Sequence, residues 1–181
     1  AEMLKDEGVR LPGARREAFG NPLLMRVPLS AGVRVIVAHC ASLGHAADTD
    51  KPSAPRVPAF ELFARLMDDS AHAALLLGDV SAVLQINRNV RIARALIERD
   101  DWHVRLLHGS DYPLPGIPIL TRPQRLADAK LLDEKAVPVL TAIREHNPLL
   151  FDFVLKRSLA VNGQPFAAPV FETAPFFKRA S

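Results

Sequence analysis

The sequence predicts an α/β fold built on a parallel sheet, because three segments with the pattern of buried strands alternate with two helical segments along the chain. The strands are expected over residues 33–40, 74–83 and 104–112. Each is a short run rich in Val, Leu and Ile that ends at polar side chains, as strands covered on both faces do. The segments between them are long enough for the right-handed crossovers that join parallel strands.

The helices are expected where the sequence shows a helix start. Asn21 followed by Pro22 is typical of an N-cap and first helical residue, and Gly32 ends the short helix before the first strand. The first crossover helix is expected to begin at Pro58, after which apolar residues recur at helical spacing. The second is expected over residues 87–99, with one apolar face.

A shaped loop, a helix and an apolar tail are expected after the third strand. Four prolines mark the loop, namely Pro113, Pro115, Pro118 and Pro123. Asn147 and Pro148 repeat the Asn-Pro helix start and open an amphipathic helix with the sequence NPLLFDFVLKRSLA. The tail from residue 161 carries several phenylalanines, so we expect it to pack on the body of the protein.

Composition indicates one soluble globular domain over residues 1–181. An apolar share of 49% is enough for a core and excludes disordered chains. The 23 basic and 20 acidic side chains leave a net charge of +3, which gives little support for binding nucleic acid. One cysteine, Cys40, excludes an internal disulfide framework, and no membrane span or secretory signal is evident, so the expected location is cytoplasmic.

Two parallel-sheet architectures remain open from the pattern alone. A doubly wound open sheet binds its ligand where the strand order reverses, whereas a (β/α)8 barrel binds it at the C-terminal ends of its strands. Three clear strands are too few for either fold, since a barrel needs eight strands and usually about 250 residues. The chain is therefore expected to be part of a larger fold.

Polar residues at the strand ends are the candidate site residues, because parallel α/β folds carry their chemistry there. His39 ends the first strand before a stretch of small residues; the alternative is a histidine that only makes a hydrogen bond at a strand end. Asp111, in HGSDYPLPG, can bind a cation or act as a base, and the alternative is a cap of the following turn. Asp79 lies in an apolar run and is expected to support the site through hydrogen bonds.

Arg88 is the candidate substrate-binding residue, because it opens the helix after the second strand and could contact an anionic substrate; a solvated helix start is the alternative. Phosphate-binding GxxxxGK[ST], dinucleotide-binding GxGxxG, HExxH and GxSxG motifs are absent from the sequence. His108 is expected on the strand face opposite to Asp111. Four further histidines are expected at the surface, namely His45, His72, His103 and His146.

Four segments, in order, carry a family resemblance: AGVRVIVAHCASLG, LLLGDVSAV, RLLHGSDYPLP and NPLLFDFVLKRSL. Together they resemble the C-terminal half of the amidohydrolase-like metal-dependent hydrolases, which include the amidohydrolase-related decarboxylases. GSDYP resembles the eighth-strand motif, so Asp111 corresponds to the metal-binding or catalytic aspartate of that family. VIVAHC resembles the sixth strand, whose histidine corresponds to His39, and LLLGDVSAV resembles the seventh strand.

The resemblance implies that the chain is the part of a (β/α)8 barrel that holds strands 6 to 8. It also implies one or two divalent metals, commonly zinc, at the C-terminal strand ends. In that family a metal-bound water attacks a small-molecule substrate, so Asp111 would be metal ligand and base, and His39 would orient water or substrate.

The departure from the family lies in the missing metal ligands. The first-strand HxH pair is absent, and so is the fifth-strand histidine; LPGARREAFGNP resembles only the connection that follows that strand. One aspartate and one histidine fall short of the three protein ligands usual for catalytic zinc. The chain is therefore expected to be a C-terminal piece of a hydrolase, to be completed by a separate N-terminal chain, or to be a degenerate relative.

A non-catalytic interaction or scaffold module that keeps the barrel segments is the alternative function. Three parallel strands cannot close a barrel, so the outer edges of residues 33–38 and 105–107 are expected to be unpaired. Another chain, further sequence of the same protein, or a second copy is expected to cover these edges.

Overall fold

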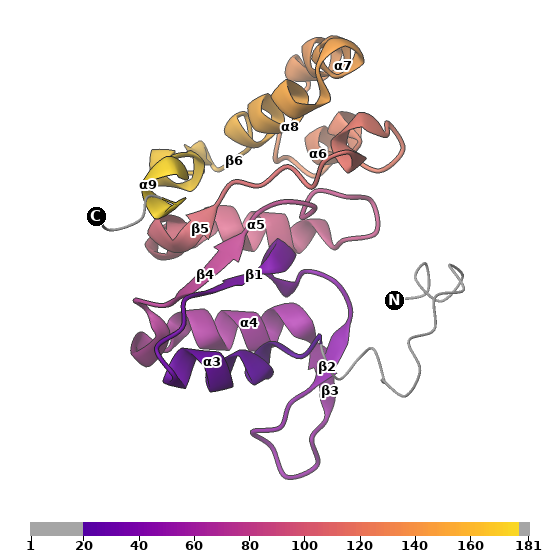
Figure 1. The fold of residues 1–181 in the computed structure, drawn as a ribbon. Coiled ribbons are helices and arrows are strands. Elements are labelled where there is room, and N and C mark those ends of the chain that lie inside the picture. Colours follow the sequence, from indigo (N-terminus) through magenta and orange to yellow (C-terminus); the bar gives the residue numbers. More distant parts are fainter. Residues whose placement is uncertain (1–19, 178–181) are drawn as a thin grey trace. The chain divides into compact units, whose positions relative to one another are not determined.

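The computed structural model describes residues 20–177 and shows a mixed α/β chain with a small three-stranded parallel sheet among helices (Figure 1). The sheet has the order β1 (Val35–Val37), β4 (Leu76–Asp79), β5 (Leu106–Leu107). The predicted alternation of strand, helix, strand, helix and strand is confirmed, with α4 (Ala59–Asp68) and α5 (Val90–Glu98) between the strands. No barrel closes within the residues that the structure describes.

Each strand is shorter than the apolar run that predicts it. The first run turns into a 3-10 helix, η2 (Ala38–Ala41), directly after β1. The second run continues past β4 as buried but irregular chain. The Val80 amide still donates to the Leu107 carbonyl of β5 at 2.9 Å, and Val83 and Leu84 then reach the core without joining the sheet. The third run begins in the 3-10 helix η4 (Asp100–Arg105) and leaves the sheet at His108.

The chain divides into two compact units, and the division falls inside β4, after Leu77. In the first unit the amide of Val35, on β1, donates a hydrogen bond of 2.8 Å to the carbonyl of Leu75. In the second unit Gly78 and Asp79 pair with Leu106 and Leu107 in parallel register.

The first unit opens with the predicted Asn21 cap. The Asn21 Oδ1 accepts the Leu23 amide at 3.0 Å, and Gly32 has a φ of 77°, the left-handed conformation that ends the following helix. The remaining elements of this unit are the following: η1 (Pro22–Met25), α3 (Arg26–Ser30), β2 (His45–Ala47), β3 (Arg56–Pro58) and η3 (Ser70–His72). Strands β2 and β3 form an antiparallel pair, and Pro58 precedes α4 rather than being its first residue.

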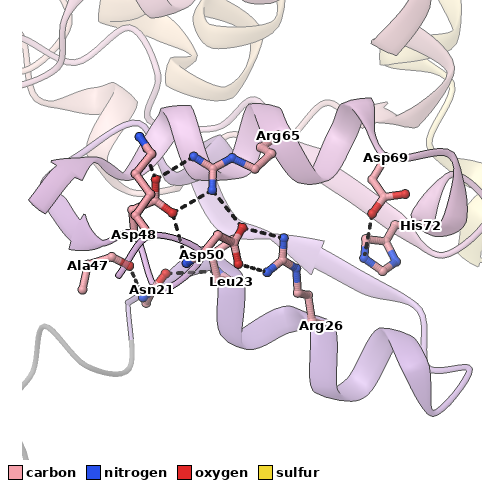
Figure 2. Close-up of polar contacts among 10 residues, drawn as sticks. Asn21, Leu23, Arg26, Ala47, Asp48, Asp50, Arg65, Asp69 and His72 are labelled. Carbon is pink, nitrogen blue, oxygen red and sulfur yellow. Dashed lines mark hydrogen bonds and ion pairs between the residues drawn. The ribbon is translucent and has the colours of Figure 1, made fainter. Parts of the chain in front are cut away.

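A buried carboxylate ties the loop between β2 and β3 to helix α4 (Figure 2). Asp48 is fully buried and accepts two hydrogen bonds from the Arg65 guanidinium, at 2.7 and 2.8 Å. Arg65 also contacts Asp50 at 2.9 Å, and Asp50 in turn pairs with Arg26 of α3. These hydrogen bonds, with that of Lys51, hold the pKa of Asp48 far below its usual range. The network fixes the hairpin to two helices of the unit.

The outer strand β1 differs from the prediction of a strand buried on both faces. Ile36 is 39% exposed and the preceding Val33 is 51% exposed. The buried apolar face of this unit lies instead on α4, where Leu62, Phe63 and Leu66 are fully buried. β1 is the end strand of the sheet and pairs along one edge only, so part of its surface stays exposed to solvent.

The second unit holds most of the helices. Beside β5, α5 and η4 it contains the following elements: η5 (Leu114–Gly116), α6 (Pro123–Asp128), α7 (Ala136–His146), α8 (Pro148–Arg157), β6 (Ala160–Val161), β7 (Gln164–Pro165), η6 (Ala168–Phe171) and α9 (Ala174–Phe177). Helices α7 and α8 pack against each other and meet at Asn147, whose Oδ1 accepts the Leu150 amide at 2.9 Å (Figure 1). The predicted cap at Asn147 is thus confirmed, and β6 and β7 form an antiparallel pair.

Trp102 lies in the core of the second unit, 1% exposed, with the Arg99 guanidinium 3.9 Å from its ring centre. The prediction that His103 lies at the surface is wrong. Its ring is buried, with Nε2 3.0 Å from the Leu96 carbonyl, and its Nδ1 accepts the Ala167 amide at 3.1 Å. A chain segment distant in sequence supplies one of these partners, so the neighbouring residues alone could not reveal the burial.

The C-terminal tail packs on the second unit, as predicted. Phe166 and Val170 are buried, and the Val170 carbonyl accepts the amide of His108 at 2.7 Å, directly after β5. This contact lies just beyond residues 105–107, so the expectation that the outer edge of those residues is unpaired stays a prediction. Among residues 20–177, none of the helices has both the length and the apolar character that crossing a membrane requires.

Candidate functional site

Two aspartates mark the ends of neighbouring strands in the second unit. Asp79 is the last residue of β4, and Asp111 lies four residues beyond β5. Asp79 Oδ1 accepts the amide of Ser81 at 2.7 Å, a contact within its own turn, and the supporting role predicted for Asp79 stays a prediction. Because Gly109 has no side chain, the backbone after β5 can lie close to Ser81 and Asp79. A Cβ at Gly109 would lie 3.3 Å from Ser81 Cβ and 3.5 Å from Asp79 Oδ1.

The carboxylate of Asp111 is held by a glutamine. Gln85 Nε2 donates to Asp111 Oδ2 at 3.2 Å, and Asp111 itself is half-buried, so its carboxylate is near the surface of the unit. Its backbone has a φ of 58°, a left-handed conformation that is uncommon for a residue with a side chain. The following turn is closed by the Asp111 backbone carbonyl, which accepts the Leu114 amide at 3.0 Å.

The segment that carries Gln85 and Arg88 is fixed by hydrogen bonds from a half-buried arginine. Arg125, on α6, donates to the Gln85 carbonyl at 3.3 Å and to the Arg88 carbonyl at 2.6 Å. The amide of Ile86 donates to Leu120 at 2.7 Å. Arg88 does not open the helix as predicted: Asn89 caps α5 by accepting the Arg91 amide, so Arg88 lies in the preceding turn.

Arg88 shares its surroundings with the two aspartates. Burial lowers the pKa of its guanidinium, while the charges of Asp111 and then Asp79 act in the opposite direction. A lowered arginine pKa still leaves the group charged at neutral pH. The turn before α5 therefore brings a half-buried cation toward the strand-end carboxylates.

A second cation, Lys156, comes from helix α8. Its side chain is 1% exposed, and Nζ donates to Asp152 Oδ2 and to the Gly109 carbonyl, each at 2.7 Å. Burial lowers the pKa of Lys156; Asp152 opposes this most strongly, and Asp79 and Asp111 add to the opposition.

His108 borders this cluster from the other side of Asp152. Its Nε2 lies 3.2 Å from Asp152 Oδ2, and its ring packs 5.4 Å from Phe153 and 5.6 Å from Phe171, measured between ring centres. His108 thus belongs to the packing between β5, α8 and the C-terminal segment. His108 and Asp111 both lie beyond the end of β5, so the prediction that they occupy opposite faces of a strand stays a prediction.

His39 lies in the first unit, in a left-handed turn after β1. His39, Cys40 and Ala41 have φ values of 55°, 49° and 49°, and Cys40 is fully buried. Three consecutive left-handed residues with side chains cost roughly 1–2 kcal/mol each, so surrounding structure has to impose this turn. The prediction that His39 and Asp111 line one pocket joins two separately described units and stays a prediction.

The donors around Asp111 do not form a divalent metal site by themselves. Within the described part of the chain, no three His, Cys, Asp or Glu side chains lie close enough together to hold a metal ion. The Gln85 amide contacts Asp111, and the charges of Arg88 and Lys156 act on it; positive charge near a carboxylate opposes the binding of a metal cation there. A zinc site completed by these residues alone is therefore not supported.

Searches of the chain against protein-family models, curated proteins and solved structures find no match. The resemblance to the amidohydrolase-like hydrolases therefore rests on the quoted segments and stays a prediction.

Three residues that lie around Asp111 and Gly109 were not predicted from the sequence, namely Gln85, Asp152 and Lys156. Asp152 and Lys156 left a signal, since an acidic and a basic residue four positions apart interrupt the apolar run LLFDFVLK. That spacing allows an ion pair on one helical face, and the flanking leucines and phenylalanines indicate that the pair is buried. Gln85 left no comparable signal, because its partner Asp111 is 26 residues away.

Proposed function

We propose that this chain is the C-terminal portion of a hydrolase of the amidohydrolase type, contributing strands 6 to 8 of a (β/α)8 barrel. Asp111 is its acid–base residue and Arg88 binds the substrate. One observation carries the proposal. The half-buried carboxylate of Asp111 follows a strand end in left-handed backbone, accepts a hydrogen bond from Gln85, and interacts with the charges of Arg88 and Lys156. Unusual backbone conformations of this kind gather at functional sites.

The chemistry follows from the groups that the site brings together. The Asp111 carboxylate can take a proton from a water whose oxygen bonds to the carbonyl carbon of an ester or amide. Arg88 can stabilise the negative charge that then develops on the carbonyl oxygen. Asp111 returns the proton to the leaving alcohol or amine as the carbon–heteroatom bond breaks, so that water is added across that bond and Asp111 is regenerated.

His39 and a divalent metal belong to the proposal only through the family resemblance. The described residues supply one donor of the expected set, Asp111, so further ligands would have to come from outside this unit. The step above uses water, Asp111 and Arg88 alone. A substrate with a carboxylate or similar anionic group beside its ester or amide suits the charge of Arg88.

The test is hydrolysis of chromogenic nitrophenyl esters and nitroanilides by the full chain, with and without added Zn²⁺ or Mn²⁺. We expect Asp111→Asn to lower kcat by about 100-fold or more, since general acid–base groups contribute at least this much. Asp128→Asn, at an exposed aspartate of α6, is the matched control and should keep the wild-type rate.

Wild-type activity in Asp111→Asn would overturn the proposal. Absence of hydrolysis by the wild-type chain under all these conditions would instead favour the alternative, a non-catalytic interaction module. Equal losses of activity in Asp111→Asn and Asp128→Asn would also overturn the proposal, because the effect would then not be specific to the strand-end carboxylate.

A further inference from the structure

Lys156 is a charged side chain almost completely removed from water. It lies in the last turn of α8, is 1% exposed, and donates to two acceptors at 2.7 Å, Asp152 Oδ2 and the Gly109 carbonyl. The first acceptor is one helical turn away, and the second is 47 residues away in the sequence. The ammonium group therefore joins helix α8 to the loop that follows β5.

Packing alone does not explain a lysine at this position. Burying a charge is costly, and replacing a buried ion pair by apolar side chains of similar size is often neutral or stabilising. Two other buried positions of α8 hold apolar residues, Phe151 and Leu155, as buried helix positions usually do. The feature that an apolar residue could not reproduce is the hydrogen bond to Gly109.

Gly109 lies two residues before Asp111, in a tightly packed stretch of chain. On one side a Cβ at Gly109 would meet Ser81 and Asp79 at 3.3 and 3.5 Å, and Lys156 bonds its carbonyl at 2.7 Å. Two residues later the backbone is left-handed at Asp111. A short segment that is fixed at Gly109 and turns sharply at Asp111 has little freedom to move the carboxylate.

We propose that Lys156 is a positioning residue that fixes the Gly109 carbonyl and thereby sets the location of the Asp111 carboxylate against Gln85. The inference rests on the proposed function for its catalytic consequence, but the positioning itself is a property of the folded chain. The other charged groups around the ammonium are Asp152, Asp79 and Asp111, and His108 shares Asp152 with it. Asp152 is accordingly the counter-ion that makes the buried cation tolerable.

The position of Asp111 can be measured without any substrate. Gln85 donates its side-chain amide to Asp111, so the NMR signals of that NH₂ group report whether the carboxylate is in place. Asp111→Ala defines the signals of the unbonded amide. We expect Lys156→Met, which keeps the length of the side chain but removes donor and charge, to shift the Gln85 signals toward those of Asp111→Ala.

Two further variants keep this test decisive. Lys156→Arg retains a cationic donor and should bring the Gln85 signals at least partly back, which a general packing defect would not predict. Lys135→Met, at an exposed lysine just before α7, is the matched control and should leave them unchanged. If Lys156→Met does not fold because Asp152 is left buried without its ammonium partner, Lys156→Met/Asp152→Asn removes both charges together.

The kinetic readout uses the ester or anilide that the wild-type chain hydrolyses. A small displacement of a catalytic group can cost about 100-fold in rate, so kcat should fall by about that factor in Lys156→Met, with little change in KM. Gln85 signals that stay in their wild-type positions in a folded Lys156→Met chain would overturn the inference, and so would displaced signals with an unchanged kcat. If the wild-type chain hydrolyses no probe, the proposed function fails, while the Gln85 signals still decide whether Lys156 positions Asp111.

Discussion

Asn21→Ala tests the hydrogen bonds that begin the first unit. The Asn21 side chain is 8% exposed and makes two contacts: Oδ1 accepts the Leu23 amide at 3.0 Å, and Nδ2 donates to the Ala47 carbonyl at 2.9 Å (Figure 2). Losing the cap costs about 1 kcal/mol. Losing the second bond costs about 1 kcal/mol more, rather than a full desolvation penalty, because the Ala47 carbonyl also accepts the Thr49 amide. We therefore expect a total loss of about 2 kcal/mol.

Matched variants separate the two contributions. Asn21→Ser keeps a capping oxygen but cannot donate to Ala47, so it should cost about 1 kcal/mol. Asn89→Ala, at the exposed cap of α5, removes a cap contact of 3.0 Å and should also cost about 1 kcal/mol in its own unit.

Residue-resolved amide exchange measures these losses unit by unit. Amides of α4 in Asn21→Ala should exchange about 30-fold faster than in the wild type if 2 kcal/mol is lost from the whole unit. The reasoning is refuted if Asn21→Ala costs no more than Asn21→Ser, because the bond to Ala47 would then contribute nothing.

Two further predictions concern stability. The first concerns Asp48, whose pKa lies below its ordinary value of 3.8 in the folded chain because Arg65 donates to it. Its stabilisation is therefore complete above about pH 4 and is lost as the pH falls through the folded-state value, and thermal unfolding of Asp48→Asn should depend less on pH in this acidic range than that of the wild type. The second concerns Phe151, which is fully buried in α8, so Phe151→Ala should cost about 3–5 kcal/mol in urea unfolding. Leu149→Ala, at a half-exposed position of the same helix, should cost far less, and equal losses would contradict the assigned burial.

Local chemistry made the helix starts predictable. At Asn21 and Asn147 the cap, the following proline and the first turn lie within four residues, and both side chains accept the amides that the sequence predicts. Strand lengths were not predictable in this way. Residues 80–84 are buried and largely apolar, as β4 is, yet the chain leaves the sheet after the hydrogen bond from the Val80 amide to Leu107. Apolar composition reports burial and says little about hydrogen-bond partners.

The candidate site was predictable to the level of single strand ends. Asp79 and Asp111 could be placed there because a polar residue that terminates an apolar run is visible in the sequence. Their surroundings depend on contacts over 26 to 47 residues, made by Gln85 and Lys156, and no local pattern encodes which distant group will meet them. The start of α5 was predicted two residues too early, which placed Arg88 inside the helix. Asn87 and Asn89 are equally good N-cap residues, and α5 uses Asn89.

The burial of Trp102 gives the two units different optical properties. It is the single tryptophan of the chain, and the single tyrosine, Tyr112, also lies in the second unit. Near-ultraviolet absorbance and intrinsic fluorescence therefore come almost entirely from residues after Leu77. On unfolding, Trp102 loses its contact with Arg99 and becomes exposed to water, so its emission should shift to longer wavelength. Far-ultraviolet circular dichroism responds to helices of both units, so coincident midpoints from the two signals would identify one cooperative transition, and separate midpoints would give each unit its own.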